Sequence, residues 1–333
     1  GSALFEDALI RGASYYLPGM SVPMLPRELS EGLISLNPDV ERRASVFAMT
    51  VDREGQCTDS EVIRARIRSR GKLTFKQVEA FLDGDESAVP SETHASLRAF
   101  AGVGEVRLAD AQRRHVLRHR PEEVRIHLDD DAEDQDLGFV VVEEVRNRVE
   151  MYSEQLSLLC NIEGGRLLRE GDVDDEGAQP IYRTHPAPSQ ERIDEFAALV
   201  ERVVQLKGAP ESFRWDPQRT PLSVYLRQLP DTGEFAGLTR AIARQAVMVN
   251  VRSTFSPDPG PHFGVGADVY ARFSAPMREV VGVYVHKELW EILGDEASTE
   301  HVAARDARLR EQVSQRANAA KSLQRELTRA ANL

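Results

Sequence analysis

The chain has 333 residues, of which 41% are hydrophobic and 29% charged, and its formal net charge is −12. This is ordinary usage for a globular protein with ample core. No apolar run of about 18 residues and no basic-then-apolar N-terminus occurs, so we expect no transmembrane span, no signal peptide and a cytoplasmic location. Cys57 and Cys160 lie far apart without Cys/His ligand spacing, which argues against disulfides and a structural zinc site.

The negative net charge argues against a nucleic-acid partner, because surfaces that bind phosphates are usually basic. The basic residues are nevertheless bunched, at 64–72 and at 113–120. A buried channel needs positive potential only along its wall, and an acidic exterior discourages nonspecific binding. The composition therefore does not exclude RNA.

The first 38 residues combine a short helix with a proline-rich segment. A helical pattern over 1–14 stops at Gly12, and prolines stand at 18, 23, 26 and 38. These prolines predict a rigid, irregular path in the first half of 15–38 rather than a helix or central strand. A rigid loop with exposed aromatics favours function, and the alternative is a connector with Tyr15 and Tyr16 in the core.

Two strands are predicted next, at 43–52 and 61–68. In the second strand Arg64, Arg66 and Arg68 share one face, which forms either an RNA-facing row or a solvated sheet face. Further strands at 124–128 and 138–145 flank the acidic turn 129–136. That turn is either a metal site or, as carboxylates at a hairpin tip favour, a solvated loop.

The remaining periodic segments predict helices. His185, between two of them, has no Asp or Ser partner at a recognisable spacing, which favours a structural role. The last helix has an apolar seam broken by Asp306 and Arg316, which favours packing on its own domain over an intermolecular coiled coil. The predicted helices cover 73–84, 94–119, 146–169, 189–204, two segments within 220–247, and 298 to the end.

Residues 15–38 contain Tyr-Leu-Pro-Gly, Val-Pro-Met-Leu-Pro and Leu-Ile-Ser-Leu-Asn-Pro. This segment resembles the exoribonuclease family of ribonuclease II and ribonuclease R, within its catalytic RNB domain. The resemblance implies an α+β fold in which helices surround a mixed sheet and form a channel for single-stranded RNA. It also implies that Tyr16 packs beside the last nucleotides. It covers nearly the whole chain, so 1–333 is expected to be one RNB-like catalytic domain truncated at its N-terminus, with flanking OB-type domains outside the sequence.

The second landmark is Ser-Ala-Pro-Met-Arg at 274–278. A capping Ser, a first-turn proline and Arg278 at a helix N-terminus suit a phosphate. The passage is similar to the family's Tyr-x-His-Phe-Thr-Ser-Pro-Ile-Arg-Arg-Tyr-x-Asp, which implies that Arg278 is catalytic and grips the scissile phosphate, and that Tyr270 binds RNA. Two departures are Arg272 for the family histidine and Glu-Val-Val-Gly after Arg278.

A third passage, Met-Tyr-Ser-Glu-Gln-Leu-Ser-Leu-Leu-Cys-Asn, ends at Asn161 and resembles the family's Ile-Glu-Glu-x-Met-x-x-Ala-Asn helix. The resemblance implies that Glu154 contacts the terminal ribose, while Gln155 departs from the family glutamate. In the last helix, Ala-Ala-Lys-Ser at 319–322 stands where the family has Ala-Glu-Arg-Asp.

The resemblance implies magnesium as cofactor, held by an aspartate cluster that precedes Tyr-Leu-Pro in the family and is absent here. No metal ligand is therefore assigned in this chain, and Glu6-Asp7 is not taken as the site. The chain is expected to be a fragment of a longer gene product or a split or degenerate family member. A missing N-terminal segment or domain would then be a partner.

Two functions follow from the resemblance. The first is a 3′–5′ exoribonuclease that processively hydrolyses single-stranded RNA to nucleoside monophosphates. It would act as a monomer, without disulfides or a membrane. The alternative is a catalytically inactive RNA-binding or scaffold protein that keeps the RNB fold, which the departures after Arg278 and near residue 320 favour.

Overall fold

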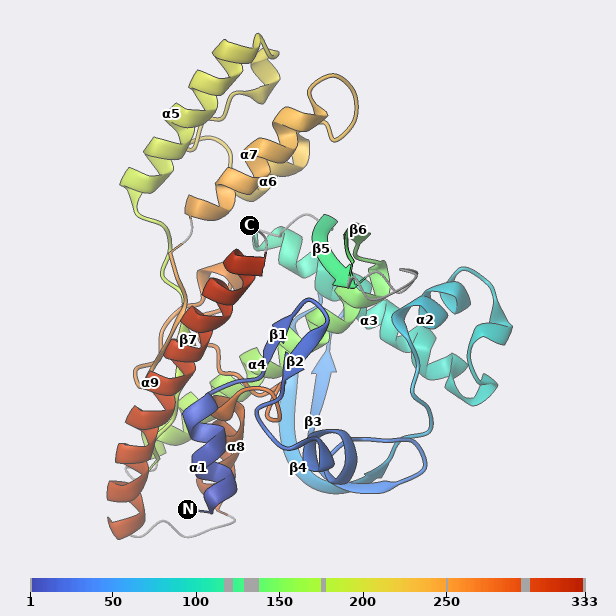
Figure 1. Cartoon of the computed structure of the whole chain (residues 1–333), viewed down its shortest axis with the longest axis vertical. Helices are drawn as coiled ribbons and strands as arrows, with labels where there is room; N and C mark the ends of the chain where they lie inside the picture. Colours follow the sequence, from blue (N-terminus) through green and yellow to red (C-terminus); the bar gives the residue numbers. More distant parts are fainter. Residues whose placement is uncertain are drawn as a thin grey trace.

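The computed structural model describes residues 2–116, 122–128, 138–174, 178–249, 251–294 and 300–331. The predicted acidic turn 129–136 lies outside the described residues, as do the ends of two predicted helices, at 117–119 and 298–299. Figure 1 shows the helices α1 (Ala3–Arg11), α2 (Phe75–Leu82), α3 (His94–Arg113), α4 (Arg148–Asp174), α5 (Gln190–Lys207), α6 (Leu222–Gln228), α7 (Ala236–Val249), α8 (Val280–Ile292) and α9 (Glu300–Ala331).

The strands pair two by two. Within the described residues each of the four pairs is antiparallel and forms its own two-stranded sheet. The α+β class is therefore confirmed, but the expectation of one mixed sheet is wrong. Three of the pairs join strands that are neighbours in sequence. Short connections of this kind produce antiparallel hairpins, because a parallel pair needs a long crossover between its strands. The pairs are β1 (Tyr15–Leu17) with β2 (Met20–Val22), β3 (Glu41–Val51) with β4 (Cys57–Arg68), β5 (Glu122–Leu128) with β6 (Phe139–Val145), and β7 (Tyr182–Thr184) with β8 (Thr254–Ser256).

The body of the molecule is built around α4, which contacts α2, α3, α8 and β4. Its core combines α4 with α8, α9 and the segment before α8, and its fully buried side chains include Leu168, Phe273, Tyr284, Leu289 and Val313. The same core contains Ala8 and Met24, so it holds the N-terminal segment against the last helix.

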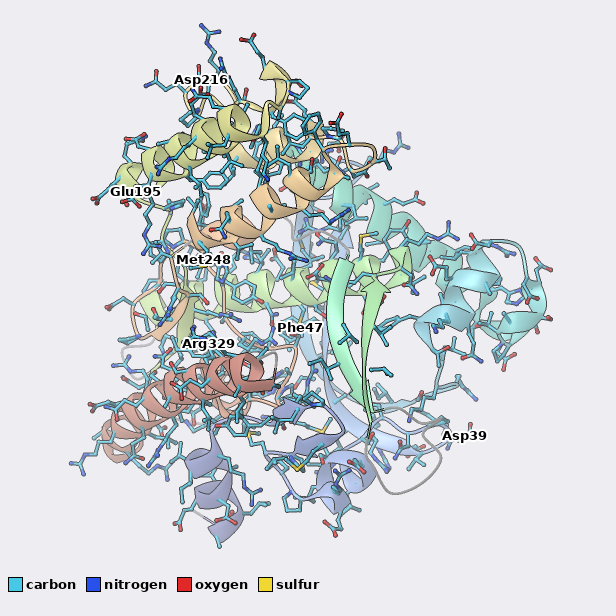
Figure 2. The ribbon with its side chains drawn as sticks, turned by 45° about the horizontal axis from the view of Figure 1, so that its top comes forward. Asp39, Phe47, Glu195, Asp216, Met248 and Arg329 are labelled. Carbon is cyan, nitrogen blue, oxygen red and sulfur yellow. The ribbon has the colours of Figure 1, made fainter. Side chains whose placement is uncertain are left out.

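Helices α5, α6 and α7 form a separate lobe with a second core. Figure 2 shows Glu195 and Asp216 on the outer part of this lobe and Met248 near its junction with the body. The buried Tyr225 hydroxyl donates to the backbone oxygen of Phe213 at 2.7 Å, which satisfies a polar group inside an otherwise apolar cluster. The three predicted helices of this region are confirmed.

The last helix packs on its own chain. It contacts α1, α8, β1 and β8, and Val313, Ala317 and Ala320 are buried in those contacts. Packing within the domain, the interpretation favoured from the sequence, is confirmed. Asp306, which interrupts the apolar seam, is buried beside Lys287 at 2.6 Å. No helix of the described part is both long and apolar enough to cross a bilayer.

The proline-rich segment differs from its prediction. Residues 15–22 form a tight hairpin in which Leu17 pairs with Met20, so Pro18 and Gly19 are the two turn residues. Proline fits the first turn position and Gly19, with φ of 69°, fits the second. The turn chemistry therefore overrides the tendency of proline to exclude strands.

The basic row of β4 lies on the surface. Arg64, Arg66 and Arg68 are exposed. Arg66 and Arg68 pair with Glu41 at 2.9 and 3.4 Å, while the Arg64 guanidinium lies 4.5 Å from the ring centre of Trp290. These contacts agree with a solvated sheet face, and the RNA-facing alternative stays a prediction.

Candidate functional site

The two landmark segments of the sequence lie side by side. The backbone N–H of Ser14 donates to the oxygen of Arg278 at 2.8 Å, and that of Val280 donates to Gly12 at 2.9 Å. Gly12 has φ of 71°, and a side chain there would meet the Arg316 backbone oxygen of α9 at 2.7 Å. The start of β1 is thereby fixed next to the start of α8.

Tyr16 is presented on the surface. Its side chain is 53% exposed, and it lines a hollow together with Leu17, Met20 and Arg27. Its backbone is held by Gln324 of α9, which accepts from the Tyr16 N–H and donates to its oxygen, both at 3.0 Å. A fixed backbone with a free ring can stack on a flat ligand group at little entropic cost.

Arg278 is exposed in a turn just before α8. Within the described part of the chain its side chain has no hydrogen-bond or ion-pair partner. The predicted cap is wrong, because α8 begins only at Val280 and Ser274 does not cap it. Instead the N–H groups of Arg278 and Glu279 both donate to the Ala275 oxygen, at 3.0 and 3.1 Å. The guanidinium is therefore available to an anion.

Asn161 fixes the segment that leads to this turn. It is fully buried on α4, and its amide donates to the Tyr270 and Ser274 hydroxyls at 2.8 and 3.0 Å. Its oxygen accepts from the N–H groups of Phe273 and Ser274 at 2.7 and 2.9 Å. A side chain on Gly165 would meet the Ala271 nitrogen at 2.9 Å, so the segment crosses α4 in direct backbone contact.

Tyr270 is 2% exposed, and its ring centre lies 4.9 Å from that of His262. Since its hydroxyl is engaged by Asn161, it supports the segment from inside. A direct contact between its ring and RNA is not available in this structure.

Glu154 is exposed on α4, with its carboxylate 3.5 Å from Arg146. It lies seven positions before Asn161, which is about two helical turns, so both residues share one face of α4. The backbone pairing brings the segment that carries Tyr16 next to the turn that carries Arg278, whereas Glu154 is linked to that turn only through Asn161 on its own face of α4. Gln155, the departure, is 3% exposed and faces inward.

The two histidines near the segment are buried. The Nδ1 atom of His185 accepts from the Gly264 N–H at 3.1 Å, and the ring centres of His185 and His262 are 5.0 Å apart. Burial lowers the pKa of His185, and burial with the nearby Arg183 lowers the pKa of His262 to about 3. Both rings are therefore neutral near pH 7, which agrees with a structural role for His185.

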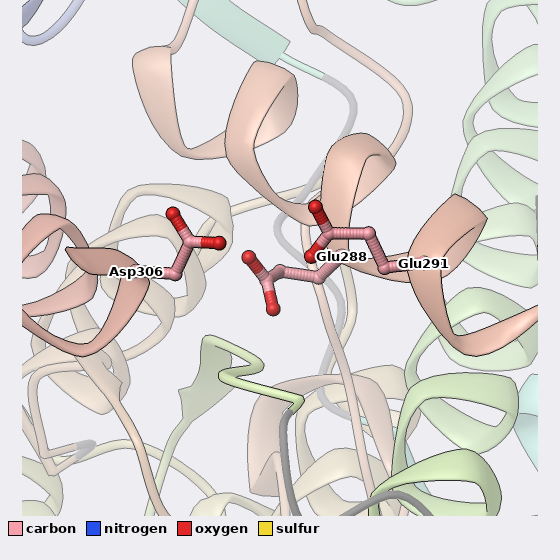
Figure 3. A group of neighbouring side chains, drawn as sticks. All are labelled: Glu288, Glu291 and Asp306. Carbon is pink, nitrogen blue, oxygen red and sulfur yellow. The ribbon is translucent and has the colours of Figure 1, made fainter. Parts of the chain in front are cut away.

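One group of carboxylates in the described residues has the spacing of metal ligands: Glu288, Glu291 and Asp306, within 4.8 Å of one another (Figure 3). The ammonium of Lys287 lies 3.1, 2.6 and 2.6 Å from these three carboxylates, at the place a cation would take. Glu288 also accepts from the Gln179 N–H at 2.7 Å. These residues therefore do not fit the implied magnesium ion, and no chemical step is assigned to them.

Sequence reasoning missed Asn161, Gly165 and Gln324 as residues that position the site. Asn161 was visible as the last residue of a family-like motif, and an Asn-x-x-Gly-Gly run inside a helix is a signal of close backbone approach. Gln324 carries no such local signal, because its role depends on the pairing of α9 with β1.

Known proteins resemble this chain over most of its length. A family model described as RNB domain matches residues 1–295. Ribonuclease R of Vibrio parahaemolyticus is 26% identical over 89% of this chain and 34% of its own length. Exoribonuclease 2 of Shigella dysenteriae is 30% identical over 90% of this chain and 44% of its own length. The chain thus spans less than half of either curated relative.

Among solved structures, Mycoplasma genitalium RNase R in complex with ribose-methylated single-stranded RNA superposes with a TM-score of 0.84. The superposition covers 100% of this chain and 50% of the RNase R chain, at 22% sequence identity. This likeness confirms the expected RNB fold.

Proposed function

We propose, from the premise that the chain belongs to the RNB domain family, that it is the core of an exoribonuclease that shortens single-stranded RNA from the 3′ end. The observation that supports the proposal is the backbone pairing of residues 12–14 with 278–280, because the segment that follows carries the exposed Tyr16 and the paired turn carries the exposed Arg278, whose side chain has no partner among the described residues. An aromatic platform next to a phosphate-binding cation is what a sequence-tolerant reader of single strands requires.

The roles of the side chains follow from their exposure. Tyr16 stacks on a base near the 3′ end, and Arg278 donates to the scissile phosphate, where it stabilises negative charge that grows during cleavage. Glu154 accepts from the hydroxyls of the terminal ribose. Tyr270 and Asn161 do not touch RNA but keep the Arg278 turn in place. The expected divalent metal would need ligands outside the residues described here, and release of nucleoside monophosphates and processive action belong to the same proposal.

The decisive test separates cleavage from binding. The chain, alone and in its full-length gene product, is incubated with 5′-labelled oligo(A) and magnesium, and the ladder of products is followed on a gel. We expect Arg278→Ala to lower turnover about a hundredfold or more, as loss of one donor to a developing charge does, with a smaller change in RNA affinity. Arg202→Ala, which removes an exposed arginine of α5, is the matched control.

Equal turnover of Arg278→Ala and the unmodified protein would show that Arg278 is not catalytic. If no form shortens the oligonucleotide but all bind it in a salt-dependent way, the protein is the inactive RNA-binding member of the family.

A further inference from the structure

A lysine ammonium is buried in the body without a hydrogen-bond partner among the described residues. Lys321 of α9 places its Nζ atom inside the protein, 4.3 Å from the ring centre of Phe255. A cation over an aromatic face gains some stabilisation, but an unpaired ammonium away from water costs several times more. Either the amine is neutral or an anion completes its surroundings.

The charged side chains that act electrostatically on Lys321 are more often positive than negative. Arg183 of β7 lies 5.9 Å from the same Phe255 ring, and Arg272 pairs with the Glu279 carboxylate at 2.8 Å. The neighbouring His185 and His262 add no charge, because burial lowers the pKa of both. We refer to the charged set as the Lys321 cluster, which consists of Lys321, Arg183, Arg272, Arg325 and Glu279.

Three segments hold this cluster in a fixed geometry. The Asn318 side chain, one turn before Lys321, accepts from the Phe255 N–H at 2.9 Å and donates to the Phe255 oxygen at 3.2 Å, which fixes α9 to β8. The Arg183 N–H donates to the Tyr270 oxygen at 2.8 Å, which fixes β7 to the segment that carries Arg272. Hydrogen bonds to the backbone thus fix the segments that carry these charges.

Part of the cluster reaches solvent. The side chains of Arg272 and Glu279 are 23% and 21% exposed, whereas the Lys321 Nζ atom is buried. The Glu279 carboxylate lies 2.9 Å from the Arg272 Nε atom, from which it accepts a hydrogen bond, and 2.8 Å from the Arg272 Nη2 atom. The Glu279 carboxylate therefore acts as an internal anion that would compete with a bound anion for Arg272.

We propose that the Lys321 cluster is a binding site for a phosphate group, which enters beside Glu279 and accepts hydrogen bonds from Lys321 and the guanidinium of Arg272. A phosphate brings several acceptor oxygens and up to two negative charges, which match an ammonium beside guanidinium forks. The inference does not rest on RNA cleavage, because the site would bind phosphate in a protein that hydrolyses nothing.

The titration of Lys321 supports this assignment. Burial and the neighbouring Arg183 lower the pKa of Lys321 to about 7, against a pull upward by Glu279. A bound phosphate would restore the charged form, so binding should strengthen as the pH falls through 7. Two sources share this chemistry, a free monoester such as a nucleotide and a phosphodiester of an RNA strand, and the experiment separates them.

The test measures dissociation constants by titration calorimetry at about pH 6.5, where Lys321 is mostly charged. The probes are inorganic phosphate, sulfate as an anion that does not titrate in this range, AMP and a short oligo(A). We expect Lys321→Met to weaken phosphate binding about tenfold or more, and Glu279→Gln to tighten it about threefold, because the internal competitor is gone. The control is Lys76→Met, which removes an exposed lysine on α2.

Weaker binding of phosphate and AMP alone in Lys321→Met assigns the site to a free monoester, and weaker binding of oligo(A) as well assigns it to the RNA backbone. Equal affinities of Lys321→Met and the unmodified protein for all four probes would overturn the proposal. If Lys321→Met does not fold, Glu279→Gln decides, and an unchanged phosphate affinity in that variant rejects the site.

Discussion

Two charged clusters lie along α9, and they differ in how their lysines are paired. The Lys287 cluster (Lys287, Glu288, Glu291 and Asp306) surrounds one ammonium with three carboxylates at 2.6 to 3.1 Å. The Lys321 cluster, about 22 Å further along the helix by its rise per residue, gives its ammonium no hydrogen-bond partner in the described residues. A buried charge with a full set of partners serves the fold, whereas one without partners points to a ligand.

The largest expected effect concerns the paired lysine. Lys287→Met should lower the free energy of unfolding by about 3 kcal/mol, because three neighbouring carboxylates lose their shared cation and Glu288 is fully buried. The loss should shrink as the pH falls toward 5, because burial raises the pKa of Glu288, which can then take up a proton. Urea unfolding at both pH values measures this, and Lys76→Met provides the control. An unchanged unfolding midpoint would remove the basis of the comparison.

The unpaired lysine should behave in the opposite way. Its folded-state pKa, about 7, lies below the ordinary 10.5, so between these values the unfolded chain binds more protons and stability rises with pH. In phosphate-free buffer Lys321→Met should therefore raise the free energy of unfolding by about 1 to 3 kcal/mol at pH 6, with a smaller gain at pH 9. Urea midpoints at the two pH values check this. A loss of stability at pH 6 would mean that the ammonium is satisfied.

The exposed surface beside the Lys321 cluster offers a test of binding without a change in stability. Tyr16→Ala should weaken oligo(A) binding by about 1 to 3 kcal/mol, the usual contribution of one stacked base. Its unfolding free energy should stay within about 0.5 kcal/mol, because the ring is exposed and the Gln324 bonds involve only the backbone. Fluorescence titration compares it with Phe75→Ala, which removes another exposed aromatic ring. Equal losses in the two variants would contradict a specific role for Tyr16.

The smallest effect is expected from magnesium. Because Lys287 takes the place of a cation between Glu288, Glu291 and Asp306, neither magnesium nor EDTA should shift the melting temperature, whereas phosphate should raise it. Differential scanning calorimetry of the chain measures both. A magnesium-dependent rise that disappears in Glu288→Gln would show that the Lys287 cluster binds metal.

The elements with local signals could be predicted from sequence. Thr74 and Gln77 form the capping box that starts α2, Ser189 caps α5, and Gly12 ends α1 in a conformation that favours glycine. The hairpin at 15–22 was not predicted, because prolines were taken as evidence against strands when Pro18 serves as a turn residue.

The candidate site could be predicted only in part. Tyr16 and Arg278 stand out by motif, and the structure pairs the two segments that carry them through backbone hydrogen bonds that no local pattern reveals. The departure at Lys321 was visible in the sequence, but its burial depends on β7, β8 and α9 meeting around Phe255. Contacts of this kind arise from tertiary packing, which the periodicity of single segments does not encode.

The two hydrogen bonds between the Gln324 side chain and the Tyr16 backbone limit how far the C-terminus of the protein can be shortened. The match to the RNB family stops at residue 295, yet α9 carries Gln324, Lys321 and the Arg316 oxygen that faces Gly12. A version trimmed at the family boundary would lose one wall of its core and release the hairpin that presents Tyr16. For recombinant work, the useful unit therefore extends to the last turn of α9.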